Sequence, residues 1–185
     1  MFKARRGAGP LAVALAMTVT ITANPAMAAS AAEINRSVDA ALASLHASVP
    51  ETRQLANRAK AVLVFPNIVK AGFMFGAAYG EGALRQNGAT VGYYSSVAAS
   101  YGYQVGFQEF GYAMFFMTDS SLQYLNQSDG FEVGVGPSIV VVDQGMGKSL
   151  TSTTLTQDVY AYIFDQQGVF AGAGIQGSKI TKINR

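Results

Sequence analysis

The 185-residue chain contains no cysteine, no tryptophan and a single histidine, His46. Without cysteine the chain has no disulfide, no thiolate metal ligand and no lipid-modified cysteine. A zinc site or a Ser-His-Asp triad would depend on His46 alone, and the acidic residues are scattered rather than grouped as a carboxylate metal site requires. We therefore expect a protein that is not an enzyme and uses no metal or cofactor.

Charge is scarce as well, and part of the positive charge lies in an N-terminal segment. The chain has 13 Lys and Arg residues against 11 Asp and Glu residues, and three of the basic residues precede an apolar stretch from Leu11 to Ile21. Ala26-Met27-Ala28 then fits an A-x-A cleavage site, so residues 1–28 have the pattern of a secretory signal peptide, with an uncleaved anchor as the alternative. Cleavage leaves 10 basic and 11 acidic residues, a net charge of −1, which argues against nucleic-acid binding. We expect an exported protein of the periplasm or cell envelope, peripheral to the membrane.

Residues 29–185 are sufficient for a single domain with a core, and their first part has a helical pattern. Ser30 and Glu33 make an S-x-x-E capping box, and Pro50 ends this helix and begins a second one that reaches about Lys60. The apolar residues of the first helix predict one buried stripe, made of Ile34, Val38, Ala41, Leu42, Leu45 and Val49.

Further along the chain the apolar period changes to two, which indicates strands. A buried strand at 61–65 is expected to end at Pro66, and from Gly72 bulky residues alternate with small ones. Every glycine after the signal peptide lies between Gly72 and Gly177, among aromatic and β-branched residues, which favours a twisted sheet. Asn87-Gly88 predicts a hairpin turn. Further elements are expected at 90–95, 96–106, 112–117 and 131–141 as strands and at 120–125 as a short helix capped by Asp119.

The last apolar run, Val159 to Ile180, predicts two strands joined by a turn. Its first strand alternates, with Val159, Ala161 and Ile163 on one face and Tyr160, Tyr162 and Phe164 on the other. Asp165-Gln166-Gln167-Gly168 supplies the turn. The complete pattern predicts an α+β fold in which N-terminal helices pack on a curled, Gly-rich antiparallel β-sheet, with a barrel-like closure left open.

Three segments occur in an order that resembles the SYLF lipid-binding domain family. They are KAVLVFP at Lys60 to Pro66, KAGF at Lys70 to Phe73, and GVFAG at 168–172, and the resemblance covers residues 59–185. It implies a non-enzymatic domain that binds phospholipid, with phosphoinositide headgroups as ligands of eukaryotic members, some of which also bind actin. Phosphoinositides and actin are not expected where an exported bacterial-type protein resides. The expected partner is therefore an anionic phospholipid membrane surface.

The basic residues of these segments give the candidate lipid-binding site. Lys60 and Lys70 match the family's segments and flank an apolar stretch. Near a membrane they can hold phosphate headgroups, while Phe65, Ile68 and Val69 supply apolar contacts.

Three further lysines are weaker candidates. Lys179 and Lys182 lie near the C-terminus, where a solvated tail is the alternative, and they fall on opposite faces of an extended strand. Lys148 lies in Gly145-Met146-Gly147-Lys148-Ser149, which imitates the end of a phosphate-binding loop, but that pattern needs a glycine where Val142 stands. We expect no nucleotide binding, and a surface loop that can touch a lipid phosphate.

Two acidic residues, Glu81 and Glu109, stand among apolar strand residues. Because an unpaired buried charge is costly, we expect them to face solvent or to pair with a nearby basic residue such as Arg85.

Two other functions remain open from the residues alone. Gly, Tyr and Phe in alternating strands also suit a small outer-membrane β-barrel, although two helices precede the strands and the apolar-out, polar-in alternation is unsteady. Aromatic, Gly-rich strands also suit a structural or self-associating envelope protein.

Overall fold

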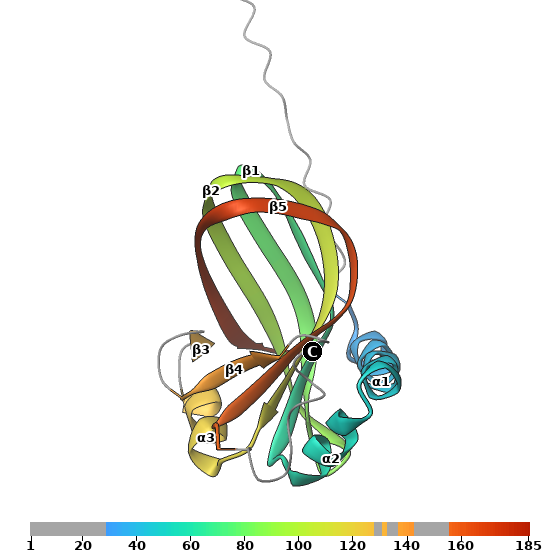
Figure 1. Ribbon diagram of the computed structural model, residues 1–185. Coiled ribbons are helices and arrows are strands. Elements are labelled where there is room, and N and C mark those ends of the chain that lie inside the picture. The colour runs from blue at the N-terminus through green and yellow to red at the C-terminus, as the bar shows by residue number, and fades with distance from the viewer. Residues whose placement is uncertain (1–28, 128–130, 133–136, 143–155) are drawn as a thin grey trace, which may run out of the picture.

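The computed structural model describes residues 29–127, 131–132, 137–142 and 156–185 (Figure 1). The predicted signal peptide and the loop that contains Lys148 lie outside these residues. The described chain combines helices with a mixed five-stranded sheet, in agreement with the predicted α+β class. The elements in order are α1 (Ala31–Ser48), α2 (Glu51–Arg58), β1 (Ala61–Gln86), β2 (Ala89–Phe116), α3 (Asp119–Gln127), β3 (Phe131–Glu132), β4 (Ile139–Val142) and β5 (Val159–Ile183).

Helix α1 begins as its sequence predicts and buries the predicted stripe. Ser30 N donates to Glu33 Oε2 over 2.8 Å and Glu33 N donates to Ser30 Oγ over 3.3 Å, which completes the capping box. Ile34, Val38 and Leu45 are buried in a cluster with residues of β1, β2 and β5. Within the described ranges, no helix is both long and apolar enough to cross a membrane.

Three long strands make up most of the sheet. β2 pairs antiparallel with β1 and with β5, and Asn87 and Gly88 form the predicted turn with φ of 52° and 80°. The order is β1-β2-β5-β3, and β4 joins β5 in parallel, so the expectation of a purely antiparallel sheet is wrong. β4 ends at Val142 and β5 begins at Val159, a separation in sequence long enough for a parallel pair. Among the described residues, no pairing joins the two ends of this path.

A bulge replaces the predicted end of the first strand at Pro66. Pro66 and Asn67 together lie opposite Gly111 of β2, and pairing resumes at Ile68. Proline is tolerated here because β1 is an edge strand and a bulged residue needs no ladder hydrogen bond. The predicted break is therefore wrong, since β1 continues to Gln86.

A second bulge, at the same level of the sheet, replaces the predicted turn in the C-terminal run. Asp165 and Gln166 together lie opposite one residue of β2, and Asp165 and Gly168 have φ of 50° and 81°. The strand keeps its direction, because β2 pairs with Phe164 before the bulge and with Gln167 after it in one antiparallel register. The predicted hairpin is wrong: the turn residues form a bulge because β2 offers a partner on both sides of it.

The long strands bend so that their two halves face each other, which Figure 1 shows as arches. A Cβ on Gly82 would overlap the carbonyl oxygen of Val64, and one on Gly80 would lie 2.7 Å from the carbonyl oxygen of Asn67. The two halves of β1 are therefore in contact. Met74, near the middle of β1, takes φ of 59°.

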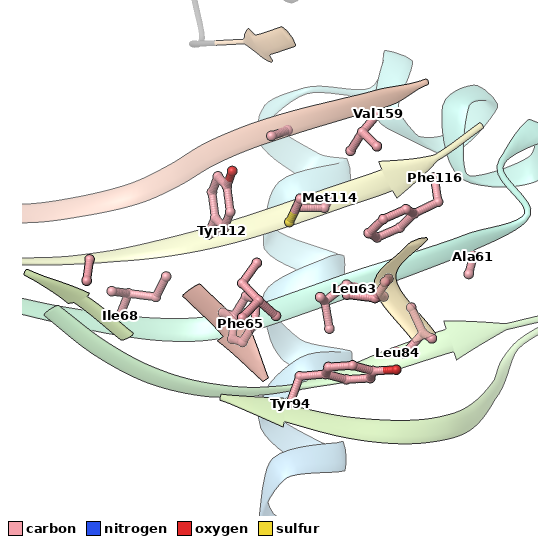
Figure 2. Packing of buried hydrophobic residues seen from close by; sticks show 14 of the residues in the cluster. Ala61, Leu63, Phe65, Ile68, Leu84, Tyr94, Tyr112, Met114, Phe116 and Val159 are labelled. Atoms are coloured by element: carbon pink, nitrogen blue, oxygen red, sulfur yellow. The ribbon is translucent and has the colours of Figure 1, made fainter. Parts of the chain in front are cut away.

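Buried side chains form one cluster on each side of the sheet. The inner cluster lies inside the arch and joins both halves of β1 and β2 with β5 and α3; Figure 2 shows part of it. The outer cluster packs α1 and α2 on the opposite side of the strands. The predicted faces of β5 are confirmed, since Val159 and Ala161 belong to the inner cluster while Tyr160 and Phe164 belong to the outer one. Large members of the inner cluster are Leu63, Phe65, Leu84, Tyr94, Met114 and Phe116.

Three local predictions differ from the structure. β2 is one strand of 28 residues rather than three, because Gly102 and Gly106, with φ of 152° and 147°, bend it without ending it. Thr118, not Asp119, caps α3, since Thr118 Oγ1 accepts from Ser121 N over 3.2 Å. The strand predicted across 131–141 forms two short strands, β3 and β4, which pair with different ends of β5.

Candidate functional site

The upper part of the arch has an exposed apolar outer surface. Figure 1 shows the helices around the lower part, whereas β1, β2 and β5 form the upper part. On this surface the side chain of Phe73 is 74% exposed and that of Tyr103 is 89% exposed. We call it the apolar tip; its outward side chains are Phe73, Phe75, Tyr101, Tyr103, Val105 and Phe107, with Tyr79, Val97 and Val169 at its margin.

The strand segments that carry the apolar tip contain no charged residue. Charged residues flank them instead: Lys70 and Glu81 on β1, Glu109 on β2 and Lys179 on β5. Exposed apolar surface without charge is unusual for a soluble monomer and marks an interaction site. The three segments are 71–80, 96–108 and 168–178, and the β2 segment 96–108 pairs with each of the other two.

The side chains on the inner side of the same segments are mostly small, and several of them are polar. Ser96, Ser100 and Gln104 of β2 are buried inside the arch, while Val97, Tyr101 and Tyr103 on the same strand are exposed on its outer side. Ser100 Oγ donates to Gln104 Oε1 over 3.0 Å, and Gln104 Nε2 donates to the carbonyl oxygen of Met74 over 3.4 Å. These bonds satisfy polar groups inside the fold. The upper arch thus has polar groups on its inner side and exposed aromatic side chains on its outer side, whereas the lower part is apolar and buried on both sides.

A cavity of about 290 Å³ lies inside the arch, between segments that are far apart in sequence. Most of its wall is apolar, but Lys70, Gln108 and Tyr112 bring polar groups to it. Lys70 Nζ lies 4.3 Å from the ring centre of Phe170, and burial lowers the pKa of the Lys70 ammonium group. Burial also raises the pKa of Tyr112 to about 12, so its hydroxyl stays protonated at neutral pH.

The two lysines of the predicted headgroup site are not brought together. Lys60 lies at the start of β1, where its backbone N–H donates to the carbonyl of Phe116 and its Nζ lies 3.1 Å from Asp119 Oδ2. Lys70 lies ten residues further along the strand, a separation of about 30 Å in extended chain. One headgroup cannot bridge both.

The apolar companions predicted for that site are mostly buried. Phe65, fully buried, stacks on Tyr112 with ring centres 6.5 Å apart, and Ile68 belongs to the same inner cluster. Val69 is half-buried. Phe65 and Ile68 therefore stabilise the fold and present no surface to a membrane.

The C-terminal lysines lie on the strand, as β5 extends to Ile183. Lys179 pairs with Val97, whose side chain points outward, and Lys182 pairs with Tyr94, whose side chain belongs to the inner cluster. The prediction of opposite faces is confirmed, and both lysines are exposed.

Glu81 pairs with a basic residue, but not with Arg85 as expected. Its carboxylate accepts from Tyr79 Oη over 2.6 Å and from Arg185 Nε over 3.3 Å, while Arg85 Nη2 lies 2.5 Å from Asp39 Oδ1. Burial raises the pKa of Glu81, but the hydrogen bonds from Tyr79 and Arg185 outweigh this and lower it overall. This contact fixes the C-terminal residue beside the apolar tip.

The residues of the apolar tip were absent from the site predicted by sequence. The available signal was the alternation of bulky and small residues from Phe73 to Gly82, combined with the lack of charge across three segments. Alternation defines two faces but does not say which one is inside, and the usual rule would place the aromatic face in the core.

Comparison with known proteins identifies a family for the second part of the fold. Residues 97–185 match the family described as Ysc84, Las17-binding protein actin regulator, which is the SYLF domain family. No curated protein matches the chain. The matched residues include β5 and most of β2, which together carry much of the apolar tip and of the cavity wall. The match over residues 97–185 confirms the resemblance to the SYLF family noted from the ordered segments of the sequence.

Proposed function

We propose that residues 29–185 form a non-enzymatic module that binds phospholipid at an anionic membrane surface by inserting the apolar tip. The observation that carries this proposal is the reversed polarity of the upper arch, with aromatic side chains outside and polar groups inside. Such a surface costs free energy in water and is stabilised in hydrocarbon. The match of residues 97–185 to the Ysc84 (SYLF) family supports the same kind of function.

The dimensions of the apolar tip fit one leaflet of a bilayer. Glu109 lies four residues from Val105 on β2, and Lys179 pairs with Val97, which lies four residues from Tyr101. Four residues of extended strand span about 13 Å, and half of the hydrocarbon core is about 15 Å thick. Immersion of the tip therefore brings the charged residues on both sides of the arch to the level of the headgroups.

Burial of the tip supplies enough free energy for reversible attachment. Full burial of a large apolar side chain is worth about 1.5–3 kcal/mol, so six partly exposed ones give on the order of 6 kcal/mol against the cost of association. Lys179 and Lys182 each add about 1 kcal/mol near anionic lipid. This second contribution is screened by salt, whereas the first is not.

Flotation with liposomes tests the proposal. We expect the mature protein to float with vesicles that contain phosphatidylglycerol. The double variant Phe73→Gln, Tyr103→Gln should lose about 2 kcal/mol of binding free energy, a weakening of at least tenfold. Both side chains are exposed in the free protein, so its thermal stability should stay close to that of the parent.

The matched control is Val91→Gln, an exposed apolar residue of β2 outside the apolar tip. This variant should float like the parent protein. Equal flotation of the double variant and the parent would show that the tip does not enter the membrane. Binding that vanishes with added salt would assign attachment to the lysines instead.

Self-association is the second candidate function, because the same exposed aromatic surface can pack against another copy. Sedimentation velocity of the parent and the Phe73→Gln, Tyr103→Gln variant, without lipid, separates the two. A concentration-dependent oligomer that the double variant abolishes would favour an assembly protein of the envelope.

We further propose that the protein is exported and acts in the periplasm or cell envelope. Cleavage after Ala28 would leave Ala29 directly before the Ser30 cap of α1, so the helix keeps its capping box. Intact-mass analysis of the extracytoplasmic fraction should give a chain that begins at Ala29, and recovery of the full-length chain from the cytoplasm would contradict export. Actin regulation is not part of the proposal, because an exported chain does not meet cytoplasmic actin.

A further inference from the structure

The cavity inside the arch is a second, separate feature of the fold. It lies on the inner side of the sheet, whereas the apolar tip lies on the outer side, so its use does not depend on membrane attachment. At about 30 Å³ for each non-hydrogen atom, the cavity of about 290 Å³ holds a ligand of about ten such atoms.

The wall of the cavity divides into an apolar and a polar part. Ile68, Ala98 and Ile180 belong to its apolar part, which continues the inner cluster. Lys70 and Gln108 are cross-strand partners in the register of β1 and β2, so an ammonium and an amide stand side by side at its polar part. None of the described lining residues is acidic.

Tyr112 brings a further polar group to the cavity. Its side chain is nine-tenths buried and lines the cavity. Its hydroxyl opens to the space that a ligand would occupy, so a ligand can hydrogen-bond to it there. Because the hydroxyl stays protonated, it can donate to an oxygen of that ligand.

We propose that this cavity binds a medium-chain carboxylate of about eight carbons, with the carboxylate at Lys70 and Gln108 and the chain against Ile68, Ala98 and Ile180. A carboxylate at this position can accept a charge-assisted hydrogen bond from the Lys70 ammonium group. The apolar wall selects for the chain, so a small anion lacks most of the contacts. The ligand therefore needs both a charge and a tail.

Isothermal titration with octanoate, below its micelle concentration, tests this inference. Octanoate should bind saturably with one site per chain, acetate should not bind, and octan-1-ol should bind at least about tenfold more weakly than octanoate. Lys70→Met, which keeps an unbranched side chain, should weaken octanoate binding by a similar factor and leave octan-1-ol binding unchanged.

The matched control is Lys179→Met, which removes an exposed lysine from the outer side of β5 and should bind octanoate like the parent. Ala98→Leu should block both ligands by filling the cavity, with thermal unfolding checked in parallel. If Ala98→Leu does not fold, the comparison of Lys70→Met with the parent still tests the proposal.

Absence of saturable octanoate binding, or equal affinity of Lys70→Met and the parent for octanoate, would overturn the proposal. Octanoate titration of the tip variant separates the two sites, because that variant should bind octanoate normally even where it fails to float.

Discussion

Replacement of Phe65 by alanine is expected to lower the free energy of unfolding by about 3–5 kcal/mol. The ring has no exposed surface and lies in the inner cluster, where it stacks on Tyr112. Truncation therefore removes buried apolar area and leaves a cavity in the inner cluster. Urea unfolding followed by circular dichroism measures the change.

Phe73→Ala is the matched control, because it removes the same side chain from a position that is 74% exposed. Its effect on stability should stay within about 0.5 kcal/mol. The two variants should thus separate folding from membrane binding: Phe65→Ala affects mainly stability, and Phe73→Ala mainly flotation. Equal losses of stability in both would mean that the apolar tip is covered in the folded protein.

Gly82→Ala should also be strongly destabilising, by about 3 kcal/mol. The added methyl group would overlap the carbonyl oxygen of Val64 and lie 2.8 Å from the ring of Phe65. Neither contact can be relieved by a rotamer change of a flexible side chain, so the two halves of β1 must separate. A lower midpoint of thermal unfolding, with more exposed apolar surface reported by dye binding, is the expected result.

Gly177→Ala provides the comparison, because a Cβ at Gly177 meets no atom within 4 Å. This substitution should be neutral or slightly stabilising, since it reduces the freedom of the unfolded chain. If Gly82→Ala proved equally harmless, the close approach of the two halves of the arch would be wrong.

The local elements could be predicted because they depend on neighbours in sequence. The capping box of α1 involves residues three apart, the Asn87-Gly88 turn involves adjacent residues, and the two faces of β5 follow from strand alternation. Each of these signals is complete within a few residues, so tertiary context had little to change.

The bulges and the bend could not be predicted because they depend on a partner strand. Pro66 and Asp165 carry ordinary signals for a strand end and a turn, yet β2 continues past both and holds the strands in register. The ion-pair partner of Glu81 could not be predicted for the same reason. Arg185 lies 104 positions away in sequence and comes close to Glu81 only when β5 has paired with β2. Charge alone favoured the nearby Arg85.

The candidate site was predicted least well. The sequence prediction chose lysines because they can bind lipid phosphates, whereas the surface that the structure exposes, the apolar tip, is made mainly of aromatic side chains. Lys60 pairs with Asp119, and Lys70 lines the cavity inside the arch rather than lying beside Lys60. The apolar tip depends on which side of the sheet the helices cover, and that is decided by long-range packing.

The central place of β2 in the sheet has a consequence for the order in which the chain must fold. β1 and β2 are adjacent in sequence, so their pairing can begin at the turn that joins them and extend along both strands. β5, in contrast, begins 43 positions after the end of β2. Until β5 pairs with β2, the edge of β2 that faces away from β1 has unpaired backbone N–H and C=O groups beside exposed aromatic rings. Such an edge readily recruits strands from other molecules. Loss of the last strand by proteolysis should therefore yield aggregates rather than a smaller folded domain.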